Sequence, residues 1–167
     1  MKKAAMLGAS LILTLVALAS GANSAAPAAI LRADTLAGVS GPFVGTANPA
    51  TNNPIRGING GGLPWSIAEG KVVLGADGSL VVRVEGLVLA SGSLTGTNPI
   101  SQFKAIVSCL TIDGASAATT NVSTGLFPAT TAGDSKIEST VTLPSPCFAP
   151  IVFVTSPGGS WFAVTGV

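Results

Sequence analysis

Cys109 and Cys147 are the only thiols of the chain, which contains no histidine and no tyrosine. Without histidine, neither a Ser-His-Asp nor a Cys-His catalytic group can form. The two cysteines lack the Cys-x-x-Cys spacing of redox and zinc sites, and no imidazole could complete a zinc shell. A signal for export, described below, makes a disulfide between them the expected state. In the chain-entropy model, closing the loop between them stabilises the fold by about 4 kcal/mol.

Carboxylates are the remaining groups for acid–base chemistry. Paired-carboxylate glycosidases need two acids facing each other across a cleft, and the spacing here brings no two together. Calcium sites need clustered oxygen ligands, which the sequence does not show. Asp77, Asp113 and Asp134 each adjoin a glycine, which is typical of turns. We therefore predict no catalytic residue, metal site or cofactor among the seven acids, which are Asp34, Glu69, Asp77, Glu85, Asp113, Asp134 and Glu138.

The most distinctive short string is the segment 59–65, which contains three consecutive glycines before Leu63, Pro64 and Trp65. No lysine and no helix start follow the glycines, so the segment is not a phosphate-binding loop. A flexible loop could present Trp65 to a sugar ring or an apolar ligand. The interpretation that we favour is a chain reversal that carries Trp65 into the core. The candidate ligand loop consists of Asn59, Gly60, Gly61, Gly62 and Trp65.

Residues 1–24 have the pattern of a secretory signal peptide. Lys2 and Lys3 are followed by an apolar stretch up to Ala19 and then by small residues suited to cleavage. The apolar stretch is short for a membrane span, and no second one follows it. We expect an exported protein, secreted or at the cell surface, that is not embedded in a membrane once the leader is removed.

Charged side chains are few. Of the eight lysines and arginines, two lie in the leader, so the rest of the chain sets six basic residues against seven acidic ones. The basic residues are scattered singly along the sequence, whereas nucleic-acid binding requires clusters of them. We therefore expect neither nucleic acid nor an anionic membrane surface as a partner.

Breaker residues divide the remaining chain into regions. Alanine-rich residues 25–38 are predicted to form a mobile N-terminal stretch, and a single β domain is predicted over 39–167. Within it, 39–64 is rich in glycine and X-Pro pairs, which favours loops with one or two short strands. A loop of this length is either functional or poorly ordered.

Alternating apolar and polar residues predict strands from Trp65 onward. Segments 68–74 and 79–89 flank a glycine-containing turn and predict a hairpin, with a β-bulge at Gly86 where the apolar phase shifts by one residue. Further strands are predicted at 103–112, 136–143, 151–155 and 160–167, and no segment has a capped helical period. The predicted fold is all-β, an antiparallel two-layer sandwich or squat barrel of about six to nine strands with one disulfide.

The strings GGGLPW at 60–65 and PCFAPIVFV at 146–154 resemble those of a group of short secreted bacterial proteins of unknown function. This resemblance covers about 63–167 and implies export and a β-rich fold, without catalytic or binding residues. The strings GKVVL at 70–74 and DGSLVVRVEGL at 77–87 are also similar to the hairpin of CHRD domains. Those domains carry a histidine-containing motif after the hairpin, which this chain lacks, so a metal-related function of that family is in doubt here.

Two functions are compatible with these observations. The first is a non-enzymatic secreted or cell-surface domain with a structural, adhesive or self-associating role, for example through sheet edges. The second is a carbohydrate-binding or carboxylate-dependent carbohydrate-active protein that uses the loop around Trp65. A surface glycan or further copies of the chain are the candidate partners.

Overall fold

The computed structural model describes residues 27–166, and the predicted leader, 1–24, lies outside them. The described chain is built from strands joined by loops and two short 3-10 turns. These elements are β1 (Ala29–Ala33), β2 (Leu36–Gly38), η1 (Gly41–Phe43), η2 (Pro49–Thr51), β3 (Trp65–Ser66), β4 (Glu69–Gly75), β5 (Ser79–Glu85), β6 (Val88–Leu89), β7 (Gln102–Asp113), β8 (Ser116–Ser123), β9 (Phe127–Pro128), β10 (Ser135–Thr140), β11 (Phe148–Thr155) and β12 (Trp161–Thr165).

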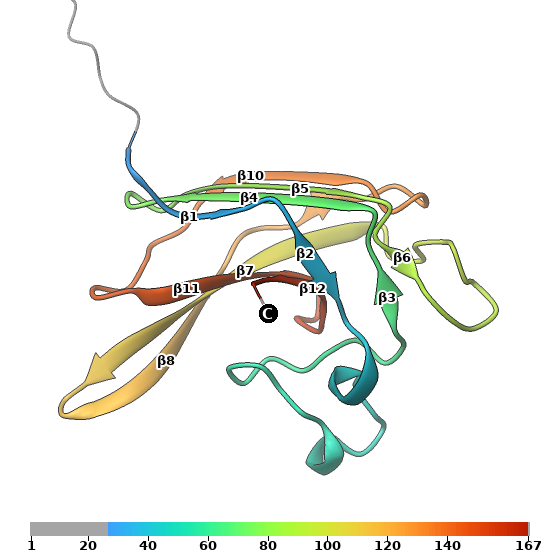
Figure 1. Ribbon diagram of the computed structural model, residues 1–167, viewed down its shortest axis with the longest axis horizontal. Helices are drawn as coiled ribbons and strands as arrows, with labels where there is room; N and C mark the ends of the chain where they lie inside the picture. Colours follow the sequence, from blue (N-terminus) through green and yellow to red (C-terminus); the bar gives the residue numbers. More distant parts are fainter. Residues whose placement is uncertain (1–26, 167) are drawn as a thin grey trace, which may run out of the picture.

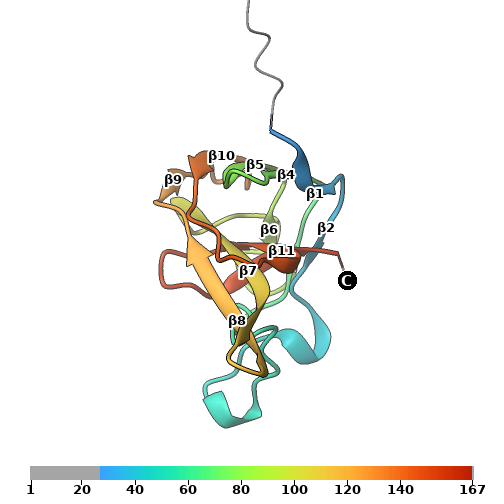
Figure 2. The ribbon, with the colours of Figure 1, turned by 90° about the vertical axis from the view of Figure 1, so that its left-hand side faces the viewer.

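Two antiparallel sheets lie over one another (Figures 1 and 2). One has the order β1-β4-β5-β10, and the other has the order β2-β12-β11-β7-β8, with β9 also paired to β7. The strands β3 and β6 form a separate two-stranded sheet. The predicted all-β sandwich is therefore confirmed. Both large sheets keep free edges, so the barrel alternative is wrong. Residues 27–166 contain twelve strands instead of six to nine, because several are too short to give a sequence pattern.

The hairpin of β4 and β5 forms as predicted, with its turn at 75–78. The Asp77 carboxylate accepts hydrogen bonds from the Ser79 hydroxyl at 2.7 Å and the Ser79 N–H at 3.0 Å. These bonds, the hydroxyl bond first, lower the pKa of Asp77. Asp77 is thus a turn residue, as its position before a glycine indicates.

The predicted bulge at Gly86 is wrong. Strand β5 ends at Glu85, and Gly86 takes a φ of 64°, which turns the chain out of the ladder. Leu87 then donates its N–H to Gly133 O, and the next residues form β6 in another sheet. The phase change in the sequence marks a strand end rather than an inserted residue.

Two other regions differ from the sequence predictions. Residues 29–33 and 36–38, expected to be mobile, form β1 and β2, because the backbones of β4 and β12 offer them open sheet edges. The strand β8 was not anticipated, since its run of alanine, serine and threonine has no apolar alternation. All three strands lie at sheet edges, where they depend on their neighbours for hydrogen bonds and need few apolar side chains of their own.

The main core lies between the two sheets. Its largest fully buried side chains include Leu74, Leu80, Val82 and Ile137 from one sheet and Phe103, Val107 and Val152 from the other. A second apolar layer covers the outer face of the larger sheet, where the segment 39–64 lies beneath it in Figure 1. There the Phe43 and Trp161 rings lie 6.2 Å apart, centroid to centroid, and the Trp161 and Phe153 rings 6.1 Å apart. The predicted loop-rich segment is therefore a cover for this sheet.

Candidate functional surfaces

Trp65, the aromatic residue of the candidate ligand loop, is only 5% exposed. Its indole stacks on the Phe162 ring with centroids 4.0 Å apart, and meets the Phe103 ring edge-on at 6.5 Å. The backbone N–H of Trp65 donates to the Val39 carbonyl at 2.9 Å. The structure places Trp65 in the core, so its indole has no free face for a sugar ring.

The glycines of the same loop permit close packing. A Cβ on Gly60 would lie 2.0 Å from Phe43 O, and one on Gly61 would lie 3.0 Å from the Phe162 ring. The loop also bonds to the backbone of β12, because Gly61 N–H donates to Trp161 O at 2.8 Å and Trp161 N–H donates to Asn59 O at 2.9 Å. Asn59 and Gly62 remain exposed, and nothing lies within 4 Å of a Cβ built on Gly62. The glycines thus bring the loop against the sheet.

The acids do not converge on a cation. Within residues 27–166, no group of three or more histidine, cysteine or acidic side chains could hold a metal ion. Asp134 has a local role, since its carboxylate accepts a hydrogen bond from Gly86 N at 3.0 Å. It joins the start of β10 to the end of β5.

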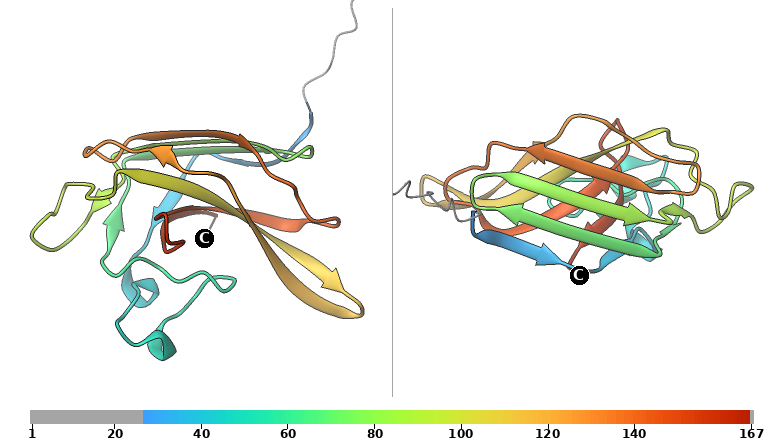
Figure 3. Two further views of the ribbon diagram at one scale, coloured as in Figure 1. Left: turned by 180° about the vertical axis from the view of Figure 1, so that it is seen from behind. Right: turned by 90° about the horizontal axis from the view of Figure 1, so that it is seen from above.

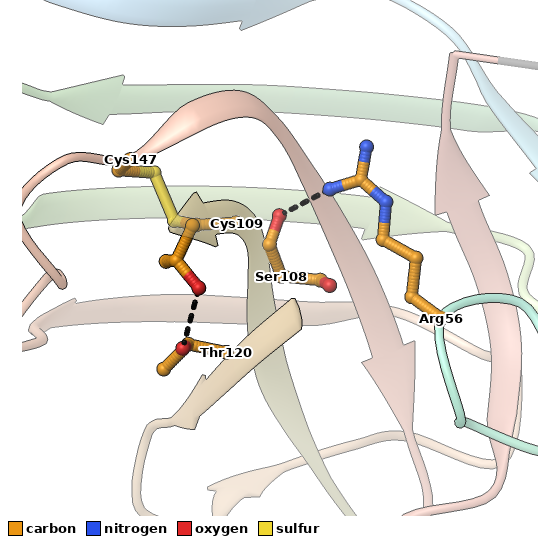
Figure 4. The surroundings of a disulfide bond; sticks show 6 residues. Arg56, Ser108, Cys109, Thr120 and Cys147 are labelled. Atoms are coloured by element: carbon orange, nitrogen blue, oxygen red, sulfur yellow. Dashed lines mark hydrogen bonds between the residues drawn. A yellow bond between two sulfur atoms is a disulfide. The ribbon is translucent and has the colours of Figure 1, made fainter. Parts of the chain in front are cut away.

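The Cys109–Cys147 disulfide forms as predicted and ties β7 to the connection before β11 (Figure 4). The neighbouring residue, Ser108, has its carbonyl bonded to the Arg56 Nη1 at 2.8 Å. The Arg56 carbonyl accepts a hydrogen bond from Asn121 Nδ2 at 3.1 Å. This bond anchors the segment 39–64, which covers the sheet, to β8 as well. Burial lowers the pKa of Arg56. These ties connect the base of the β7–β8 hairpin to the segment before β11 and to the loop that contains Arg56.

The strand β8 is an unprotected sheet edge. It pairs with β7 through eight consecutive residues without a bulge, and among the described residues β7 is its one strand partner. It contains no charged residue and no proline. Charges, prolines and bulges are the usual devices that stop an edge from pairing with another chain. The hairpin extends beyond the rest of the sheet, at the lower left of Figure 1 and the lower right of Figure 3, left.

Three exposed apolar side chains accompany this edge. Leu110 and Ile112 alternate on one face of β7 and are 38% and 58% exposed. Phe148, 53% exposed, is the cross-strand partner of Leu110 on β11 and lies on the same face. We call Leu110, Ile112 and Phe148 the hairpin patch. Contiguous exposed apolar side chains of this kind mark interaction surfaces.

A second surface is the outer face of the four-stranded sheet, which collects most of the charged residues. We call it the charged face, and Figure 3, right, shows its strands uppermost with no described segment across them. The cross-strand partners Lys71, Arg83 and Lys136 form a basic row over β4, β5 and β10. Two residues away from the basic row on each strand, Glu69 of β4 and Glu85 of β5 are also cross-strand partners. Together with Asp134, just before β10, they form an acidic row beside the basic one.

Like charges directly opposite one another destabilise a sheet, so both rows are unfavourable within a single chain. Lys136 and Glu138 form the only ion pair found within residues 27–166, at 2.6 Å. The hollows on this face are modest, of about 340 Å³ beside Lys136, about 270 Å³ over Val73 and Val81, and about 150 Å³ between Glu69, Lys71 and Glu85, and Arg83 lines all three. It resembles a docking face more than an enclosed binding pocket.

No family model, no curated protein and no solved structure matches this chain. The surfaces themselves must therefore carry any functional argument. Among the described residues, no helix is long and apolar enough to cross a membrane.

Sequence reasoning treated the charged residues as isolated and missed both rows. A signal was present in the spacing, because Glu69 and Lys71, like Arg83 and Glu85, stand two apart on predicted strands. The rows become visible only once the register sets Lys71 against Arg83 and Glu69 against Glu85. Periodicity gives the face of a residue but not its neighbour on the next strand.

Proposed function

We propose that the protein is an exported, non-enzymatic domain that associates with copies of itself by pairing β8 with β8 of a second copy. The single observation that carries this proposal is the free β8 edge, which has eight residues and no charge, proline or bulge. Export is supported by the disulfide, which is typical of oxidising compartments, together with the leader pattern of residues 1–24.

A second copy is the occupant that best suits this edge. An antiparallel pair of identical strands is self-complementary about a twofold axis, so it needs no other partner. Because β8 is uncharged, such pairing sets no like charges against one another. Its threonines and Val122 favour extended structure. The hairpin patch lies next to the edge and adds apolar surface on a hairpin held at its base by the disulfide.

The test introduces charge at the edge. Ala117 and Thr119 are exposed on β8, so Ala117→Lys/Thr119→Lys should leave the fold intact while opposing strand pairing. The matched control is Ala117→Ser/Thr119→Ser, which adds no charge. Analytical ultracentrifugation should show self-association for the parent and the serine variant, and its loss for the lysine variant. Equal association by the lysine variant would contradict the proposal, as would a parent that stays monomeric at all concentrations.

A further inference from the structure

We infer that the charged face is a second self-contact, which joins β8-paired copies into an open array. The open array rests on the proposed function, because it requires β8 pairing as well. The contact between two charged faces requires only a second copy of the chain. The charged face and β8 belong to different sheets and lie apart in Figure 1, so occupation of one leaves the other free. A copy with two separate self-complementary contacts continues the assembly instead of closing it as a pair.

The spacing of the two rows supplies the complementarity. On β4, Glu69 and Lys71 stand two residues apart on the outer face, and on β5 the same holds for Glu85 and Arg83. Two copies can stack face to face about a twofold axis that lies in the plane of contact, runs perpendicular to the strands and passes between the two rows. This arrangement places the acidic row of one copy over the basic row of the other. Glu69 of one copy then meets Lys71 of the other.

The same operation applies to the neighbouring strands. It sets Glu85 against Arg83 of the second copy, and it sets Asp134 against Lys136 at the start of β10. Each pair occurs twice because the contact is symmetric. The repulsion between Lys71 and Arg83, and that between Glu69 and Glu85, becomes attraction between two chains, since each of these cations then faces a carboxylate. Lys136 already has Glu138 beside it in its own chain.

The sign pattern disfavours other occupants. A polyanion such as a sulfated or uronate polysaccharide would bind the basic row but would meet the acidic row two residues away. A polycation would be attracted by the acidic row but repelled by the basic row. A second copy presents both rows in the required order, so charge complementarity points to this chain itself.

The test is a four-residue swap that conserves net charge. Lys71→Glu/Arg83→Glu makes both rows acidic on β4 and β5, and Glu69→Lys/Glu85→Lys makes both basic. The combination of all four substitutions exchanges the rows and restores complementarity. Asp134 is left unchanged because its carboxylate supports Gly86. Circular dichroism and thermal melting would verify that each variant folds.

Sedimentation velocity should show assemblies larger than dimers for the parent, and dimers for either two-residue variant. We expect each two-residue reversal to weaken the face contact roughly tenfold or more, because like charges would meet across it. The swapped variant should form large assemblies again, yet should not co-assemble through this face with the parent. In 1 M NaCl, where the Debye length is about 3 Å, the parent should fall to dimers.

The outcomes separate this inference from the proposed function. If two-residue variants assemble like the parent, or if the folded swapped variant fails to assemble, the charged face is not a self-contact, whereas β8 pairing stands. If Ala117→Lys/Thr119→Lys has no effect while the charge variants do, β8 pairing is wrong and the face contact stands as a salt-sensitive dimer. A monomeric parent that binds heparin only with Lys71 and Arg83 intact would overturn the inference and assign the face to a polyanion.

Discussion

Replacement of Trp65 by alanine should destabilise the fold severely. The side chain is 95% buried, stacks on Phe162 and makes an edge contact with Phe103. Truncation of a buried tryptophan costs about 3–5 kcal/mol, and aromatic pairs add about 0.5–1.5 kcal/mol beyond area burial. A domain of this size has a total stability of about 5–15 kcal/mol, so Trp65→Ala should remove a large fraction of it. The melting temperature should fall by roughly 10 °C or more.

Urea unfolding followed by circular dichroism measures this loss at a concentration that keeps the chain monomeric, because association would add apparent stability. Leu63→Ala is the matched control, since Leu63 belongs to the same loop but is 43% exposed. We expect the control to stay within about 0.5 kcal/mol of the parent. An unfolding midpoint for Trp65→Ala equal to that of Leu63→Ala would refute the placement of the indole in the core, and would reopen its role as a ligand contact.

Two further stability predictions use the same assay. Cys109→Ala/Cys147→Ala should lose about 4 kcal/mol through release of the loop between the cysteines, and an unchanged midpoint on reduction of the parent would contradict this. Gly60→Ala should lose about 1–3 kcal/mol because its Cβ would overlap Phe43 O, whereas Gly62→Ala, with open space around it, should lose little. Equal effects of the two alanine variants would show that the loop does not pack as described.

The sequence predicts those parts of the fold in which the type of each side chain indicates whether that residue is buried or exposed. The alternation of Leu80, Val82 and Val84 with polar residues sets the face of β5, and glycine positions locate its hairpin. The export pattern and the count of two cysteines suffice for the disulfide. Edge strands such as β1 and β8 were missed because they form on a neighbour's free backbone groups, which leave little trace in side-chain type.

The candidate surfaces were harder to predict for a related reason. The loop around Trp65 stands out in the sequence through its composition, but its glycines serve contacts with Phe43 and Phe162. The residues of the charged face look like ordinary surface residues in the sequence. Their arrangement in rows follows only from the register between neighbouring strands. Register depends on turn geometry and on the pairing of whole strands, so it cannot be obtained from one segment at a time.

The distribution of charge links the two proposed contacts. A chain with few charges and a net charge near zero has weak long-range repulsion between copies. Such a chain usually places its charges where they block association, above all on exposed edges. This chain leaves β8 uncharged and gathers most charges on the outer face of the opposite sheet, in rows that set like charges opposite one another within one copy. Neither feature helps an isolated domain, and both are what the proposed assembly of identical copies requires.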